Sequence, residues 1–232
     1  MKSRKHLTLV GDFETTVYKG QERTDVWASA IVELYKDDVV ILGSIFDTYE
    51  YLDNLNSNIV IYYHNLKYDG HFWLYYLLCV KKFIHAFTKD GRQNEEDMPK
   101  ESFNYVISDR GQWYLIVIKT SCGKIIEIRD SLKLLPFSVK EIGKTFGTKH
   151  KKLEMEYEGT RFPNCFISED EKNYIKNDVL VVKEALELLF NDGYNSLTIG
   201  SCCLKEYKKT LLFKEEFDRF FPNLKNFCLD EK

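Results

Sequence analysis

The pattern of apolar and polar residues near the start of the chain predicts a buried β-strand that carries two acids. Residues 7–14 are mostly apolar or small, and Leu9 and Phe13 are typical of a central strand. Asp12 and Glu14 are two positions apart, so an extended strand directs both carboxylates to the same face. Charge beside buried surface is costly unless it is paired or binds a cation. The pair therefore indicates a metal site or, if the strand has ended before Asp12, two solvated loop acids.

Further apolar runs predict a sheet-rich core. The polar residues 36–38 predict a hairpin turn between the first two of these runs, and a short helix is expected at residues 52–55. The polar segment 89–102 predicts a mobile loop that interrupts the sheet without dividing the domain. The predicted strands cover residues 25–35, 38–46, 59–63, 103–109, 112–119 and 124–129.

A helix is predicted directly after the strand at residues 59–63. Its apolar side chains, among them Phe72 and Trp73, follow the i, i+3, i+4 spacing of a helix with one buried face. Asp69 lies one turn before Phe72 on the same face. This acid is either a site residue or an N-cap, and the cap is the more common role for Asp at such a junction.

Two capping boxes predict the later helices. Ser138 with Glu141 begins a short basic helix that Gly147 ends, and Ser168 with Glu171 begins a long helix over residues 169–191. Residues 196–232 predict two small helices. Their phenylalanines are expected to pack back onto the body, at Phe213, Phe217, Phe220 and Phe221.

The long helix carries a third candidate site acid. Asp178 is three residues after Ile175 and four before Val182, so it lies on or beside the apolar stripe. Tyr174 lies one turn before it. The helix alone is equally consistent with a solvated Asp178 at the edge of the stripe.

Composition narrows the class of protein. With 232 residues, 44% of them hydrophobic, the chain can bury the core of one large domain. No apolar run approaches the roughly 20 residues of a membrane span and no signal-peptide core follows the first charges, so a cytoplasmic location is expected. Six cysteines without C-x-x-C spacing predict reduced thiols rather than a zinc site or a disulfide framework.

The negative net charge of the chain argues against non-specific binding of nucleic acid by the protein as a whole. The formal net charge is −3, although basic residues are concentrated between positions 140 and 152. A nucleic-acid partner would therefore have to be recognised at a local site.

Together the four acids suggest one metal centre. Asp12, Glu14, Asp69 and Asp178 are oxygen ligands without a Cys or His cluster, a set that suits Mg²⁺ or Mn²⁺. Two such ions about 3.5–4 Å apart activate a water and stabilise the leaving oxygen of a phosphodiester. Tyr174 is placed to orient that water, because a phenol with a pKa of about 10 is a poor ionised base at neutral pH.

Three ordered motifs carry a resemblance to a known family. They are Asp12-Phe13-Glu14-Thr15-Thr16, His64-Asn65-Leu66-Lys67-Tyr68-Asp69-Gly70 and Tyr174-Ile175-Lys176-Asn177-Asp178. With residues 110–114 and 130–137 between them, the chain resembles, over nearly its whole length, the 3′→5′ exonuclease domain of protein-primed family B DNA polymerases of phages and linear plasmids. This domain is a branch of the DEDD exonucleases. The resemblance implies an α/β ribonuclease H-like fold, with a mixed central β-sheet flanked by α-helices.

The resemblance also implies roles for individual residues. Asp12, Glu14 and Asp178 would hold the ion that activates water, Asp12 and Asp69 would hold the second ion, and Tyr174 would orient the water. Lys152 falls roughly where the family has a catalytic lysine, and Lys151 is nearly as good a match. The family usually has Phe at the position of Tyr68. Candidate ligands of the frayed 3′ strand are Thr15, His64, Asn65, Tyr68, Phe72, Ser131 and Leu132.

The expected function is proofreading hydrolysis of single-stranded DNA from its 3′ end, by one exonuclease domain over residues 1–232. Residues from about 196 would form a helical extension leading toward a polymerase palm, whose motifs the chain lacks. Expected partners are the DNA 3′ end, a polymerase domain and a priming terminal protein, in a bacterial host cytoplasm if a phage encodes the chain. The sequence leaves open a piece of a longer polymerase, a free-standing exonuclease acting on RNA or short oligonucleotides, and a catalytically silent module that binds single strands or the priming protein.

Overall fold

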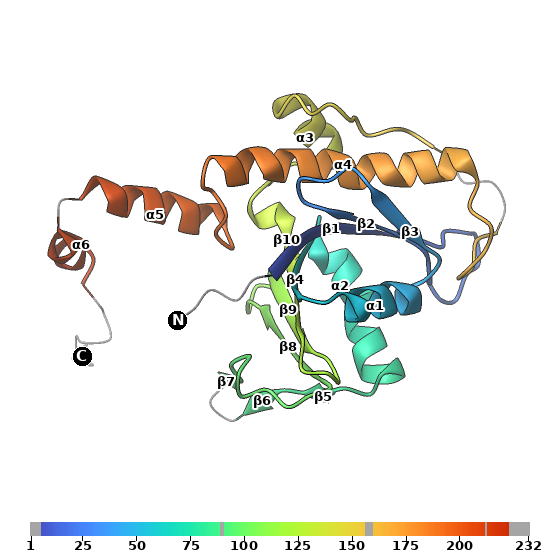
Figure 1. The fold of residues 1–232 in the computed structure, drawn as a ribbon, viewed down its shortest axis with the longest axis horizontal. Coiled ribbons are helices and arrows are strands. Elements are labelled where there is room, and N and C mark those ends of the chain that lie inside the picture. Colours follow the sequence, from blue (N-terminus) through green and yellow to red (C-terminus); the bar gives the residue numbers. More distant parts are fainter. Residues whose placement is uncertain (1–5, 89–90, 156–159, 212, 223–232) are drawn as a thin grey trace.

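A mixed β-sheet forms the centre of the computed structural model, which describes residues 6–88, 91–155, 160–211 and 213–222. Its strands are β1 (His6–Thr15), β2 (Val26–Glu33), β3 (Val39–Leu42), β4 (Asn58–Tyr63), β5 (Ile84–His85), β8 (Ser102–Ile107), β9 (Trp113–Lys119) and β10 (Ile125–Asp130). Within the described ranges the strand order is β3-β2-β1-β4-β10-β9-β8-β5 (Figure 1). Strands β1, β4 and β10 run parallel to one another, and antiparallel pairs extend the sheet on both sides.

Helices cover both faces of this sheet. They are α1 (Ile45–Asn54), α2 (Leu66–Tyr75), a π-helical turn η1 (Tyr76–Val80), a 3₁₀ turn η2 (Ser131–Lys133), α3 (Val139–Thr145), α4 (Glu169–Asn191), α5 (Ile199–Thr210) and α6 (Lys214–Phe220). Helix α4 crosses one face with α3 beside it, and α1 and α2 lie on the other (Figure 1). This mixed sheet flanked by helices confirms the predicted fold class.

Successive side chains of β1 point to opposite faces of the sheet and pack into two separate hydrophobic cores. Leu9 and Phe13 pack with α1 and α2, whereas Val10 packs with the apolar stripe of α4. Asp12 and Glu14 share the parity of Val10, so they emerge on the α4 face. The strand therefore delivers its two acids to the helix that carries Asp178.

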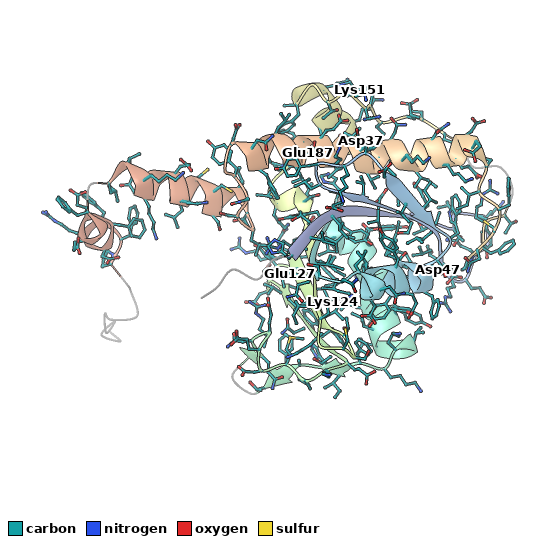
Figure 2. The ribbon with its side chains drawn as sticks, in the orientation of Figure 1. Asp37, Asp47, Lys124, Glu127, Lys151 and Glu187 are labelled. Atoms are coloured by element: carbon teal, nitrogen blue, oxygen red, sulfur yellow. The ribbon has the colours of Figure 1, made fainter. Side chains whose placement is uncertain are left out.

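Helix α1 is longer than the sequence pattern predicted. The preceding strand ends at Leu42 rather than Phe46, because Ser44 caps a helix by accepting a hydrogen bond from the backbone N–H of Asp47. At the other end, the nearly buried ammonium of Lys124 donates to the carbonyl oxygens of Leu52 and Leu55, each at 2.8 Å (Figure 2). This contact comes from the start of β10, so local sequence could not reveal it.

The segment predicted as a mobile loop contains ordered structure. A small hairpin pairs β6 (Phe87–Thr88) with β7 (Gly91–Arg92), and Met98 is buried in a minor apolar cluster. The side-chain amide of Asn104 donates to the carbonyl oxygen of Gln93 at 2.7 Å. Most of the described residues of this segment lie outside helices and strands, as a loop requires, but the hairpin and these contacts add structure that the sequence did not predict.

The C-terminal helices do not pack against the body as predicted. The ring of Phe217 stacks on Phe221, and both rings contact Tyr207 of α5. Phe213 and Phe220 are exposed, and α5 and α6 extend away from the sheet (Figure 1). The cause is that α5 leaves the core after Cys202, which is buried under α4.

Two predictions from composition can be compared with the described residues. The five cysteines in the described ranges are free thiols, and Cys228 lies outside these ranges. Across the same ranges, no helix combines the length and apolar character that a bilayer crossing needs.

Candidate active site

Three carboxylates meet where β1 passes under α4. Asp12 and Glu14 stand on β1, and Asp178 is buried on α4. One ligand oxygen from each can be chosen so that all three lie within 4.8 Å of one another. Strand β1 continues to Thr15, so the alternative of two solvated loop acids was wrong.

Asp69 lies outside this group of three, and it comes from the helices on the opposite face of the sheet. The pairing of β1 with β4 ends at Gly11 and Tyr63, and the chain then turns into α2. Asp69, on the first turns of α2, is 2% exposed. After burial, the negative charge of Asp69 is the next largest cause of the raised pKa of Asp12.

A glycine allows the close packing beside these acids. A Cβ atom on Gly11 would come 2.9 Å from the Cδ1 of Ile61 and 3.0 Å from the Cζ of Tyr63. Both partners are buried on β4. A larger residue would therefore push β1 away from β4 one position before Asp12.

Protons are held tightly in the cluster. Burial, together with the charges of Asp69, Glu14 and Asp178, raises the pKa of Asp12 well above its usual range. Burial is the main cause that raises the pKa of Asp69 to about 8, and the charges of Glu14 and Asp130 add to it. Burial also raises the pKa of Asp178, against the effect of a neighbouring lysine. The raised pKa values of these three acids show that their negative charges are disfavoured by burial and, for Asp12 and Asp69, by neighbouring acids.

The donor set fits divalent magnesium or manganese. One oxygen each of Asp69 and Asp178, the Oδ1 atoms, is buried without a hydrogen-bond partner among the described residues. Unpaired buried oxygens are costly unless another group satisfies them. Four carboxylates without Cys or His provide hard oxygen ligands, so Asp12, Glu14 and Asp178 could hold one ion and Asp12 with Asp69 a second.

Lys152 reaches the cluster and Lys151 does not. The Nζ of Lys152 forms an ion pair with Asp178 Oδ2 and lies 3.4 Å from the Tyr174 hydroxyl. The Nζ of Lys151 instead donates to the carbonyl oxygen of Gly143, so this side chain lies beside α3 (Figure 2). Burial and the charge of Asp178 raise the pKa of Tyr174, which keeps its phenol protonated as a hydrogen-bond donor.

Thr15, Tyr68 and Phe72 form one group of the predicted strand ligands. The hydroxyl oxygens of Thr15 and Tyr68 are 2.6 Å apart, and the Tyr68 and Phe72 rings meet edge to face with centroids 5.6 Å apart. Thr15 directly follows the acid pair of β1. The group therefore extends from the carboxylates along the exposed side of α2.

His64, Asn65, Ser131 and Leu132 form the second group. The His64 Nε2 lies 2.8 Å from the Phe137 carbonyl oxygen, so this nitrogen carries the proton, and Nδ1 lies 3.0 Å from Ser131 Oγ. Burial lowers the pKa of His64. Both ring nitrogens thus have protein partners, and the imidazole holds Ser131 in place.

Asp130 organises this second group, although the sequence analysis did not single it out as a site residue. Its Oδ1 accepts hydrogen bonds from the backbone N–H groups of Asn65 and Leu66, each at 3.2 Å, and of Leu132 at 3.1 Å. The alternative that Asp69 is the N-cap was therefore wrong, since α2 begins after Asn65 and Asp130 accepts its first N–H groups. The Asp130-Ser131-Leu132 order is typical of a capped turn, but the contact across to α2 depends on the fold.

Comparison with known proteins shows that the chain is similar to viral DNA polymerases. The family described as DNA polymerase type B, organellar and viral, matches residues 53–168. The DNA polymerase of Bacillus phage B103 is 34% identical over 221 residues, and that of Streptococcus phage Cp-1 is 26% identical over 247 residues. These matches cover 92% and 96% of this chain but only 36% and 37% of the two polymerases.

Solved structures of the Phi29 DNA polymerase have a similar fold. Its complex with single-stranded DNA matches with a TM-score of 0.78, and its complex with primer-template DNA matches with a TM-score of 0.77. Each is 30% identical and covers 92% of this chain and 36% of the polymerase chain.

Proposed function

Because the chain belongs to the organellar and viral type B DNA polymerases, we propose that it is a metal-dependent 3′→5′ exonuclease that hydrolyses single-stranded DNA. The observation that carries the proposal is the meeting of Asp12, Glu14 and Asp178 within 4.8 Å. Three carboxylates that gather beside a buried fourth have no purpose in a scaffold, because they repel one another without a cation.

In this proposal the four acids hold two divalent ions. Asp12 is the shared ligand, Glu14 and Asp178 complete one site, and Asp69 completes the other. When bound, such ions polarise water and stabilise the oxygen that leaves the phosphodiester. The unpartnered Oδ1 atoms of Asp69 and Asp178 supply buried lone pairs for this purpose.

Tyr174 and Lys152 position the reacting groups. The protonated phenol of Tyr174 donates a hydrogen bond that orients the attacking water. Lys152 remains charged, because its contacts with Asp178 and Tyr174 raise its pKa against the effect of burial. Its ammonium fixes the carboxylate of Asp178 and adds positive charge beside the scissile phosphate.

The frayed strand lies along the two groups of side chains around the acids. The rings of Tyr68 and Phe72 provide faces for stacking on bases, and Thr15 and Ser131 provide hydroxyls. Asn65 has positive φ (67°) in the turn before α2, which leaves its side chain exposed. Leu132 contributes apolar contact, and His64 positions Ser131.

The biological role that fits best is proofreading. The chain spans about a third of the length of the curated polymerases it matches. We therefore propose that residues 1–232 form one exonuclease domain, that the helices after about residue 196 lead toward a polymerase palm, and that the partners include a priming terminal protein. The relatives are phage proteins, so a bacterial host cytoplasm is the proposed location.

A comparison of DNA and RNA substrates tests the proposal. Oligonucleotides of matched sequence, labelled at the 5′ end in one set and the 3′ end in another, are incubated with Mg²⁺. We expect the 5′-labelled DNA to shorten progressively while the 3′ label is released as mononucleotide. Faster loss of RNA would identify a ribonuclease instead, because a 2′-hydroxyl is what separates the two substrates at a given site.

A further inference from the structure

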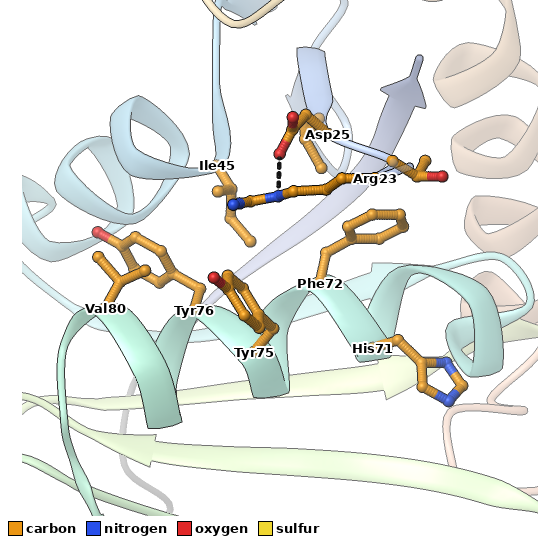
Figure 3. Close-up of a pocket in the computed structure, with 10 residues that line it drawn as sticks. Arg23, Asp25, Ile45, His71, Phe72, Tyr75, Tyr76 and Val80 are labelled. Carbon is orange, nitrogen blue, oxygen red and sulfur yellow. Dashed lines mark ion pairs between the residues drawn. The ribbon is translucent and has the colours of Figure 1, made fainter. Parts of the chain in front are cut away.

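A pocket of about 310 Å³ lies beside the exposed part of α2, away from the carboxylates (Figure 3). The segment 23–26 forms one side, and residues of α2 and η1 form the other. Arg23 lies across the pocket above Phe72, Tyr75 and Tyr76, with Ile45 behind it (Figure 3). The pocket therefore has apolar walls and one cation, Arg23, which is paired with Asp25.

The pocket is continuous with the proposed path of the DNA strand. Phe72 lines it and also contacts Tyr68, whose hydroxyl meets Thr15. Thr16 and Asp25 exchange two hydrogen bonds of 2.9 Å, from the Thr16 N–H to the Asp25 carbonyl and from the Asp25 N–H to the Thr16 hydroxyl. The end of β1 is thus joined directly to the wall of the pocket.

The lining has the chemistry that single-stranded nucleic acid requires. The Tyr75 ring is 48% exposed, and the Arg23 guanidinium lies 5.0 Å from its centroid. Arg23 is 2.7 Å from the Asp25 carboxylate, which fixes it over the pocket. Tyr76 is buried and closes the apolar floor of the pocket. Aromatic faces and a planar cation suit a nucleobase and its phosphate.

We propose that this pocket binds one unstacked nucleobase of the substrate strand, upstream of the nucleotide at the 3′ end. The base stacks on Tyr75 and Phe72, and Arg23 contacts the phosphate of the same nucleotide. The inference rests on the proposed function and deepens it, because it assigns a separate subsite to an internal nucleotide.

An abasic scan tests the subsite. A series of labelled DNA oligonucleotides carries one abasic nucleotide at successive positions from the 3′ end, and binding is measured by fluorescence anisotropy with the uncleaving Asp12→Ala protein. Loss of one base–aromatic stack predicts about 5- to 100-fold weaker binding at one internal position. In Asp12→Ala/Tyr75→Ala, the intact strand binds more weakly and the abasic nucleotide at that position adds no further loss.

Two controls separate stacking from general damage. Tyr75→Phe keeps the ring and is expected to keep the abasic profile. Phe220→Ala removes an exposed ring on α6, away from the pocket, and is also expected to keep it. Arg23→Gln, a second variant on the loop side, is expected to weaken binding of the intact strand and to reduce its salt dependence.

The outcomes distinguish this inference from the proposed function. An unchanged abasic profile in the Tyr75→Ala background would overturn the subsite even if the parent protein cleaves DNA. A profile that depends on Tyr75, in a protein that never cleaves, would keep the subsite and reject the exonuclease. Absence of binding to every oligonucleotide would reject both.

Discussion

The hydroxyl of Tyr68 lies 2.6 Å from the hydroxyl of Thr15, and this contact connects α2 to the end of β1 beside Asp12 and Glu14. The resembled family usually has Phe at this position, so the contact is a feature of this chain. The extra hydroxyl of Tyr68 therefore forms a hydrogen bond between α2 and β1, which could not be predicted from the sequence.

Tyr68→Phe is expected to lower the free energy of unfolding by about 0.5–1 kcal/mol, because one partly exposed hydrogen bond is lost. The ring remains, so stacking on a base is retained. Denaturant unfolding and the KM for single-stranded DNA measure the two effects. A loss of cleavage comparable to that of Tyr68→Ala would show that the hydroxyl, not the ring, contacts the substrate.

Lys152→Met is expected to slow cleavage by roughly 10- to 1000-fold, since it removes positive charge beside the reacting phosphate and frees Asp178. The matched control is Lys151→Met, the adjacent lysine whose Nζ binds a carbonyl of α3. Single-turnover rates of both variants are compared with the parent. Equal effects of the two substitutions would mean that the ion pair with Asp178 has no part in the reaction.

Tyr174→Phe is expected to slow cleavage by about 10- to 100-fold without abolishing it, because the water is less well oriented while all four carboxylates remain. The pH profile of the single-turnover rate provides a second readout. A profile that keeps its shape supports an orienting role. Complete loss of cleavage would instead assign the phenol a proton-transfer step.

The metal-free protein is expected to lose stability as the pH rises from about 4 to about 8. The folded pKa of Asp69 is about 8, against 3.8 for an ordinary carboxyl, so the folded protein binds more protons than the unfolded chain over this range. Linkage then makes the free energy of unfolding fall with rising pH. Melting temperatures measured in EDTA should show this slope, and Asp69→Asn should reduce it.

Divalent metal is expected to counteract this loss of stability at high pH. A cation relieves the repulsion among the carboxylates, so Mg²⁺ or Mn²⁺ should raise the melting temperature more at pH 8 than at pH 5. Asp12→Asn should remove most of this gain and stabilise the metal-free protein. A melting temperature that no divalent metal changes at either pH would exclude the proposed metal centre.

Local signals in the sequence were sufficient for the elements that carry most of the site. The capping box of Ser168 and Glu171 and the stop near Gly193 define α4 as the structure has it, from Glu169 to Asn191. The apolar run before Asp12 likewise predicted β1. In both cases the determining contacts lie within a few residues of one another, so the sequence contains them directly.

Long-range contacts explain what the sequence could not predict. For Asp69 the local sequence left a site residue and an N-cap both open, and the contact that decides between them comes from Asp130, more than sixty residues later, which accepts the first N–H groups of α2. Phe217 and Phe221 were expected to pack onto the body, whereas their partner in the structure is Tyr207 of α5. The choice between Lys151 and Lys152 likewise depended on which side chain faces α4.

The measurement that tests the central claim most directly is a gel time course on a 5′-labelled single-stranded DNA oligonucleotide. Parent protein and Asp12→Ala are run side by side with Mg²⁺, with Mn²⁺ and with EDTA. The two-metal account predicts a ladder that shortens from the 3′ end only with parent protein and metal, while Asp12→Ala still binds the strand. An intact oligonucleotide in every lane, or cleavage by Asp12→Ala at the parental rate, would contradict it.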